Sequence, residues 1–204
     1  MRRAGWSNRE LSGHRQVRTL GARVELTRHF CQRWLHKAAL YDPAQLEDAF
    51  DKFFTLFVAY NRLYFHTAQV SGRAERRDRL KATRLFPEVI GHEFLWQKLT
   101  EGVGTADVQT LGRLIGPSGS FFLISGADPD TPDANRNADL GRRLNSRSHR
   151  VAIEAVLEYL YQVRCNMFHG SKGFEARQLQ LLQPCLRCLE RIVMAGLERI
   201  GVAV

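Results

Sequence analysis

The sequence predicts an all-α fold, and three observations carry this prediction. Apolar residues recur at a spacing of about 3.6 residues over several long segments, which is the pattern of amphipathic helices. No segment alternates apolar and polar residues in the way that indicates a set of β-strands. The chain has 204 residues, 44% of them hydrophobic, which is enough to enclose one core, so a single domain is expected.

The strongest predicted helix follows Asp42-Pro43, a pair that favours a helix start with Asp as N-cap and Pro in the first turn. Its aromatic stripe is typical of a core or a dimer seam rather than a cofactor site, and comprises Leu46, Phe50, Phe53, Phe54, Phe57, Tyr60 and Tyr64. A shorter helix is expected before it over residues 25–40, and one or two short helices after it around Pro87.

Residues 102–148 are rich in Gly, Pro, Asp and Asn, so we expect a long irregular insertion, or loop-rich segment, before the next helix. That helix begins near His149 and ends at His169-Gly170, where Gly favours a C-cap. A last helix is expected over 175–200. Residues 1–22 are basic and predict a flexible tail, which leaves 23–204 as a single helical domain.

The chain carries a formal net charge of +9, and arginine supplies most of its 30 basic residues. Such an excess attracts polyanions, of which nucleic acid is the commonest. The arginine-rich stretch 73–84 is the densest part, and Arg73, Arg76 and Arg77 are its candidate phosphate-binding residues. A solvated charged face is the alternative interpretation of the same residues.

The four cysteines do not form the pattern of a disulfide framework, and no apolar run has the length of a membrane span. A cytoplasmic protein without membrane contact is therefore expected. Cys185 and Cys188 form one C-x2-C pair without a second pair at zinc-site spacing, which favours two small helix residues over metal ligands. No metal or cofactor is expected.

Arg164 and His169 are the residues best suited to chemistry. Histidine can take or give a proton near neutral pH, and the arginine fork can hold a phosphate. On an unbroken helix five positions leave the two side chains about 140° apart, so they can share a cleft only if the backbone departs from helix near His169. Gly170 permits that departure. The alternative is an ordinary helix end in which Arg164 pairs with an acid such as Glu154 or Glu158.

The segment YQVRCNMFHGSK around this pair resembles the R-N-x-x-x-H-G motif of the HEPN family of small α-helical domains. VAYNRLYFH in the long aromatic helix is similar to the N-terminal helical region of many such domains, and the resemblance spans residues 45–197. It implies a HEPN-like helical bundle that acts as a metal-independent endoribonuclease, with two Arg–His motifs meeting at a homodimer interface.

The resemblance also implies roles for individual residues. His169 would be the general acid and base, and Arg164 would bind the scissile phosphate. Asn166 would hydrogen-bond the phosphate or orient His169, with capping of the helix as its alternative role, and Lys172 would touch the RNA backbone. Many HEPN domains are toxins or defence effectors, which implies a regulatory partner of the antitoxin type.

Two other functions stay open. HEPN domains usually carry Asn, Asp or His directly after the arginine, whereas this chain has Cys165 there. This difference favours a non-catalytic module that binds RNA or a nucleotide in the same cleft. The second alternative is a structural adaptor whose aromatic stripe docks a protein partner.

Overall fold

The computed structural model describes residues 8–115, 119, 121–125, 131–168 and 175–201. Over these residues the chain is helical, and one isolated antiparallel bridge, between Ser125 and Pro132, is the only β-type pairing. The predicted all-α fold is therefore confirmed for the part of the chain that the structure describes.

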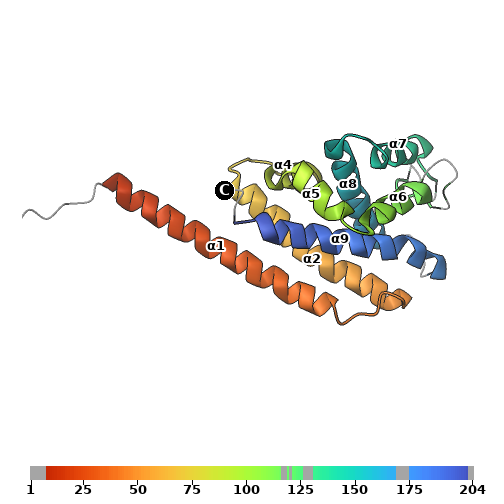
Figure 1. Cartoon of the computed structure of the whole chain (residues 1–204), viewed down its shortest axis with the longest axis horizontal. Coiled ribbons are helices and arrows are strands. Elements are labelled where there is room, and N and C mark those ends of the chain that lie inside the picture. Colours follow the sequence, from red (N-terminus) through yellow and green to blue (C-terminus); the bar gives the residue numbers. More distant parts are fainter. Residues whose placement is uncertain (1–7, 116–118, 120, 126–130, 169–174, 202–204) are drawn as a thin grey trace, which may run out of the picture.

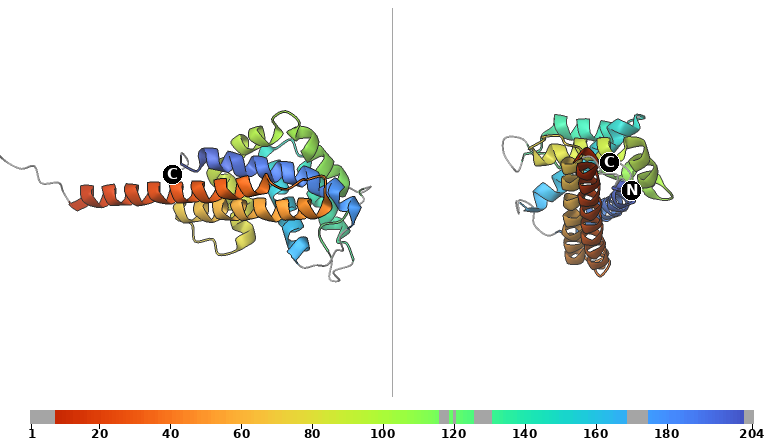
Figure 2. Two further views of the ribbon diagram at one scale, coloured as in Figure 1. Left: turned by 90° about the horizontal axis from the view of Figure 1, so that it is seen from below. Right: turned by 90° about the vertical axis from the view of Figure 1, so that its left-hand side faces the viewer.

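Three long helices lie side by side along the molecule: α1 (Asn8–Ala38), α2 (Leu46–Val70) and α9 (Leu179–Arg199) (Figure 1). α1 and α2 are antiparallel, and the N-terminal part of α1 projects beyond the other helices (Figure 2). The expected flexible tail over 1–22 is thus wrong from Asn8 onward, because α1 begins there; residues 1–7 lie outside the described part. The stretch contains good helix formers such as Arg, Leu and Glu, and its basic composition concealed them.

The aromatic stripe of α2 is the centre of the core. Phe53, Tyr60 and Tyr64 are at most 1% exposed. The Tyr60 and Phe86 rings pack edge to face, with 5.1 Å between their centroids. The Tyr60 hydroxyl donates a hydrogen bond of 2.6 Å to the Ala82 carbonyl. Most of the stripe is therefore packed against the protein's own helices, which leaves little of it for docking a partner.

The chain after α2 forms four short elements: α3 (Asp78–Leu80), the π-helical turn η1 (Lys81–Leu85), α4 (Phe86–Ile90) and α5 (His92–Thr100). Gly91 separates the last two with a φ of 104°, a conformation that favours glycine. The short helices predicted around Pro87 are thus present, with Pro87 in the first turn of α4, where its missing N–H is tolerated.

The expected irregular insertion over 102–148 is wrong for about half of its length, because it contains α6 (Gly104–Ile115) and α7 (Ala134–Leu144). α6 buries Val108, Leu111 and Ile115, and its buried Asp107 pairs with Arg187 of α9 at 2.7 Å. In α7, the Asn137 side chain accepts hydrogen bonds from the backbone N–H groups of Leu123 and Ile124. These polar residues serve packed helices here, which composition alone could not reveal.

α8 (His149–Phe168) runs through the upper half of the molecule as drawn in Figure 1, between α5 and α7. Ile153, Leu157 and Leu160 are fully buried. The short helix η2 (Ala176–Gln178) leads into α9. No helix in the described ranges has the length and apolar character needed to cross a membrane.

Candidate functional site

Arg164 lies in the last two turns of α8 and is half-buried. Its guanidinium carbon is 5.8 Å from the ring centroid of Tyr161 and 5.9 Å from that of Phe57. A guanidinium near aromatic faces is held by the ring quadrupole and by contact with the rings. The two rings, one from α8 and one from α2, therefore fix the position of this cation.

A carboxylate from a third element, Asp78 at the start of α3, lies in the same region. It accepts hydrogen bonds from the Tyr64 hydroxyl at 3.0 and 3.1 Å and from the Tyr161 hydroxyl at 3.1 Å. These bonds link α2, α3 and α8 at one point. We refer to Tyr64, Asp78, Tyr161 and Arg164 as the Asp78 cluster.

Electrostatics shows that Arg164 belongs to this cluster. Burial and the Asp78 carboxylate raise the pKa of Tyr161 to about 12, while the charge of Arg164 opposes this rise. The pKa of Tyr64 is raised for the same reasons, burial first, and is again opposed by Arg164. Both phenols therefore stay protonated at neutral pH and donate to Asp78, which disperses part of the carboxylate's negative charge.

Asn166 lies one turn of α8 beyond Gln162 and makes two hydrogen bonds. Its side-chain amide donates to the Leu123 carbonyl at 2.9 Å, and its oxygen accepts from the Gln162 amide at 2.9 Å. The residue thus ties the end of α8 to the segment 121–125. Its predicted contact with a phosphate or with His169 stays a prediction.

Of the other predicted site residues, three are exposed on the surface and two lie outside the part of the chain that the structure describes. His169 and Lys172 lie outside the described residues; α8 ends at Phe168, directly before the histidine. Arg73, Arg76 and Arg77 are exposed on the segment between α2 and α3. Arg73 pairs with Glu88 at 2.6 Å and Arg77 with Glu75 at 3.3 Å, and Arg77 directly precedes Asp78.

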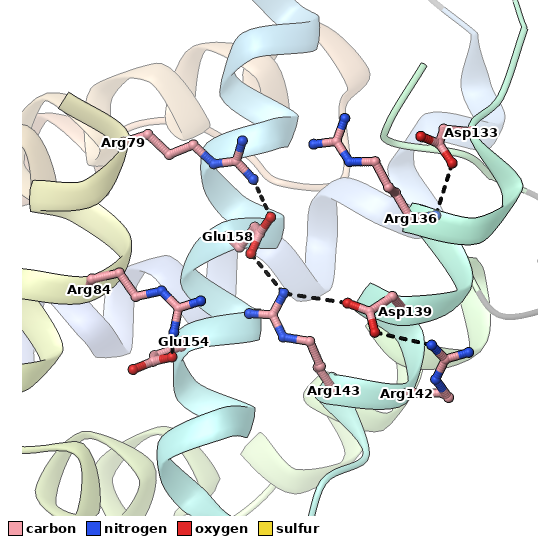
Figure 3. Close-up of polar contacts among 9 residues, drawn as sticks. All are labelled: Arg79, Arg84, Asp133, Arg136, Asp139, Arg142, Arg143, Glu154 and Glu158. Atoms are coloured by element: carbon pink, nitrogen blue, oxygen red, sulfur yellow. Dashed lines mark hydrogen bonds and ion pairs between the residues drawn. The ribbon is translucent and has the colours of Figure 1, made fainter. Parts of the chain in front are cut away.

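The structure adds a polar network along α8 that the sequence analysis did not identify (Figure 3). Arg79 and Arg143 reach Glu158 from opposite sides, and Arg143 is 2.9 Å from the carboxylate. One turn earlier, Glu154 pairs with Arg84 of η1 and with Arg150 of α8 itself. Arginines from α3, η1, α7 and α8 thus converge on two glutamates.

Glu154 is buried and Glu158 is mostly covered, whereas most of their partners are exposed to a larger extent. The side chains of Glu154 and Glu158 are 5% and 15% exposed. Burial raises the pKa of Glu158, but the hydrogen bond from Arg143 and the charge of Arg79 outweigh burial, so that the pKa is lowered below its ordinary 4.5. The carboxylate is therefore ionised at neutral pH and holds its arginines in fixed positions.

One part of this network can be recognised from the sequence. Arg150, Glu154 and Glu158 are spaced by four residues on a predicted helix, which places them on one face. The contributions of Arg79, Arg84 and Arg143 come from other elements and depend on tertiary packing.

The described residues contain no group of three or more His, Cys, Asp or Glu side chains placed to hold a metal ion. Comparisons with protein-family models, with curated proteins and with solved structures find no match for this chain.

Proposed function

We propose that this chain is a metal-independent endoribonuclease of HEPN type, in which Arg164 binds the scissile phosphate and His169 transfers protons. The observation that supports it best is the environment of Arg164: two rings hold its guanidinium in the final turns of α8, shortly before His169 in the chain. A phosphate-binding cation works best when its orientation does not have to be organised during the reaction.

The chemistry balances with these residues alone. The ribose 2′-oxygen attacks the adjacent phosphorus while an imidazole takes the 2′-hydroxyl proton. The bond to the 5′-oxygen then breaks, and the leaving oxygen receives a proton from an imidazolium. The products are a 2′,3′-cyclic phosphate and a 5′-hydroxyl, and Arg164 stabilises the charge that builds on the phosphate oxygens. In a homodimer the second copy of the motif supplies a second histidine.

The experiment that tests this proposal is RNA cleavage in excess EDTA by the wild type, His169→Ala and Arg164→Ala. Cleavage by the wild type, its loss in both variants and a cyclic phosphate at the new 3′ end support the proposal. Arg177→Ala is a matched control, because Arg177 is an exposed arginine of η2. Cleavage that survives in His169→Ala, or that EDTA abolishes, contradicts the proposal.

A non-catalytic RNA-binding module is the second candidate, and two observations favour it. Cys165 stands directly after Arg164 instead of a polar residue. Both hydrogen-bonding ends of the Asn166 side chain are engaged by Gln162 and Leu123. For this candidate the wild type binds RNA in the same assay and leaves it intact, and His169→Ala lowers affinity only.

A nuclease of this type acts on the RNA of its own cell unless it is restrained. The proposal therefore includes a homodimer and a regulatory partner of the antitoxin type. Sedimentation of the purified chain tests the homodimer directly, because a dimer has twice the 23.4 kDa mass of one chain.

A further inference from the structure

The network on α8 presents positive charge to solvent. Arg79, Arg84, Arg143 and Arg150 contribute four positive charges against the two carboxylates of Glu154 and Glu158. We call these four residues the arginine track. His92 also lies 3.3 Å from Glu154, but burial and the charge of Arg150 lower its pKa, so it is neutral at neutral pH. The net charge of the network is therefore +2, and it is the same when Asp139, which pairs with both Arg143 and Arg142, is counted together with Arg142.

Burial separates the two signs of charge. The glutamate side chains are nearly covered, whereas Arg150, Arg84 and Arg79 are 73%, 51% and 41% exposed. Solvent thus meets guanidinium groups whose orientation is fixed from beneath by a carboxylate. Each planar guanidinium has five N–H donors, so those that do not face the glutamate remain available to an incoming anion.

The arginines also crowd one another. The pKa of Arg84 is lowered, first by burial and then by the charge of Arg143, with Arg150 and Arg79 adding to the effect and Glu158 opposing it. A bound anion would relieve this repulsion, and pre-positioned guanidinium groups lose little conformational freedom when they bind it.

The geometry favours a chain of anions over a single one. Glu154 and Glu158 are four residues apart on α8, which places the two carboxylates that hold the arginines about 6 Å apart along the helix axis. The same helix continues through Tyr161 to Arg164, and Arg79 adjoins Asp78 in the chain. The arginine track therefore leads along α8 to the Asp78 cluster.

We propose that the arginine track binds the phosphate backbone of the RNA strand and guides it to Arg164. The identity of the polyanion rests on the proposed function, whereas the location of the surface rests on the network itself. A single strand suits this surface because its phosphates are spaced along one line and its backbone is flexible.

The test is fluorescence anisotropy with a labelled single-stranded RNA whose 2′-oxygens are all methylated, measured over a series of salt concentrations. Methylation removes the attacking hydroxyl, so binding is read without cleavage. For the double variant Arg84→Gln/Arg150→Gln we expect an affinity about ten-fold lower, and a salt slope of log affinity that is smaller by about 1.4. Arg150→Gln alone, which leaves Arg84 on Glu154, is expected to lower the slope by about 0.7.

Arg28→Gln/Arg33→Gln is the matched control, because it removes two positive charges from α1, which α2 and α9 separate from α8 (Figure 1). An unchanged slope in this control, with circular dichroism melts like the wild type for all variants, supports the arginine track. Equal losses in both double variants would show diffuse attraction and overturn it. Tighter binding of a polyglutamate peptide than of the RNA would also overturn it.

The outcomes separate this inference from the proposed function. A changed slope in a protein that does not cut unmethylated RNA keeps the arginine track and rejects the nuclease. Cutting that depends on His169, together with an unchanged slope in Arg84→Gln/Arg150→Gln, keeps the nuclease and rejects the arginine track.

Discussion

The two ends of α8 fix arginines by different means. In its first half, Glu154 and Glu158 hold arginines by ion pairs, and the exposed sides of these arginines meet solvent. In its last turns, the Tyr161 and Phe57 rings hold Arg164, while the nearby carboxylate of Asp78 accepts from two phenols. A carboxylate neutralises part of the charge of the arginine that it pairs with, whereas an aromatic ring carries no formal charge. Under the proposed function, the first arrangement suits a surface that binds several phosphates weakly, and the second suits the scissile phosphate.

The largest difference between the two ends is expected when each loses its carboxylate. Asp78→Ala leaves the hydroxyls of Tyr64 and Tyr161 without their acceptor, and Tyr64 is 1% exposed, so we expect a loss of about 3 kcal/mol in the free energy of unfolding. Glu154→Ala leaves Arg84 and Arg150, which can hydrate because they are more than half exposed, so the loss should be about 1 kcal/mol. Urea unfolding of both variants measures the difference, and an equal or reversed order would contradict it.

A smaller effect is expected from acid. The folded-state pKa of Glu158 is lowered below 4.5, so the unfolded chain binds more protons than the folded one between these two values. The contribution of Glu158 to stability is therefore complete above about pH 4.5 and is lost as the pH falls through its folded pKa. Urea midpoints between pH 3 and pH 7 should fall less on acidification in Glu158→Gln than in the wild type. Parallel curves for the two proteins would show that Glu158 does not carry this part of the acid sensitivity.

Tyr161→Phe should produce a smaller change again. It removes one of the two phenols that donate to Asp78, and because Tyr161 is only partly buried the loss of stability should be about 1 kcal/mol or less. Its ring stays beside Arg164, so if ring contact fixes the guanidinium, RNA affinity should change less than about two-fold. Tyr161→Leu removes the ring as well and is the informative partner. Equal affinities for the two variants would show that the ring does not position Arg164.

Sequence periodicity located the helices that bury an aromatic or aliphatic stripe, because such stripes repeat along the chain. It missed α6 and α7, where glycine and asparagine have packing roles. A Cβ on Gly112 of α6 would stand 2.9 Å from the Asn145 side chain at the end of α7, so glycine here permits close approach of two helices rather than a loop. Composition records the residue type and not the neighbour that requires it.

The candidate site was predictable to the same limited extent. Arg164 stood out by its context, at the end of an amphipathic helix in the segment RCNMFHG, and the structure places it in a defined setting. Asp78 did not stand out, because its two phenol partners lie 14 and 83 residues away in the chain. The start of α2 shows the limit at short range: the Asp42 carboxylate accepts from the Ala44 N–H and closes a turn, so the helix begins at Leu46 and not at Pro43.

The smallest expected effect concerns the reactivity of the four cysteines, three of which are buried and one of which is partly exposed in the last turns of α8. Cys31, Cys185 and Cys188 are fully buried, and burial raises the pKa of each thiol, to about 12 for Cys31 and Cys188. Their thiolate fractions at neutral pH are therefore negligible, and alkylation should stop at Cys165, which is partly exposed on the turn that carries Arg164. Mass spectrometry after iodoacetamide treatment should find one modified site, which is absent in Cys165→Ser.

The same alkylation can report on the path of the RNA. RNA with methylated 2′-oxygens should slow the modification of Cys165 in the wild type and slow it less in Arg84→Gln/Arg150→Gln, because the arginine track no longer directs the strand along α8. Protection that is equal in the two proteins would mean that RNA reaches Arg164 by another path.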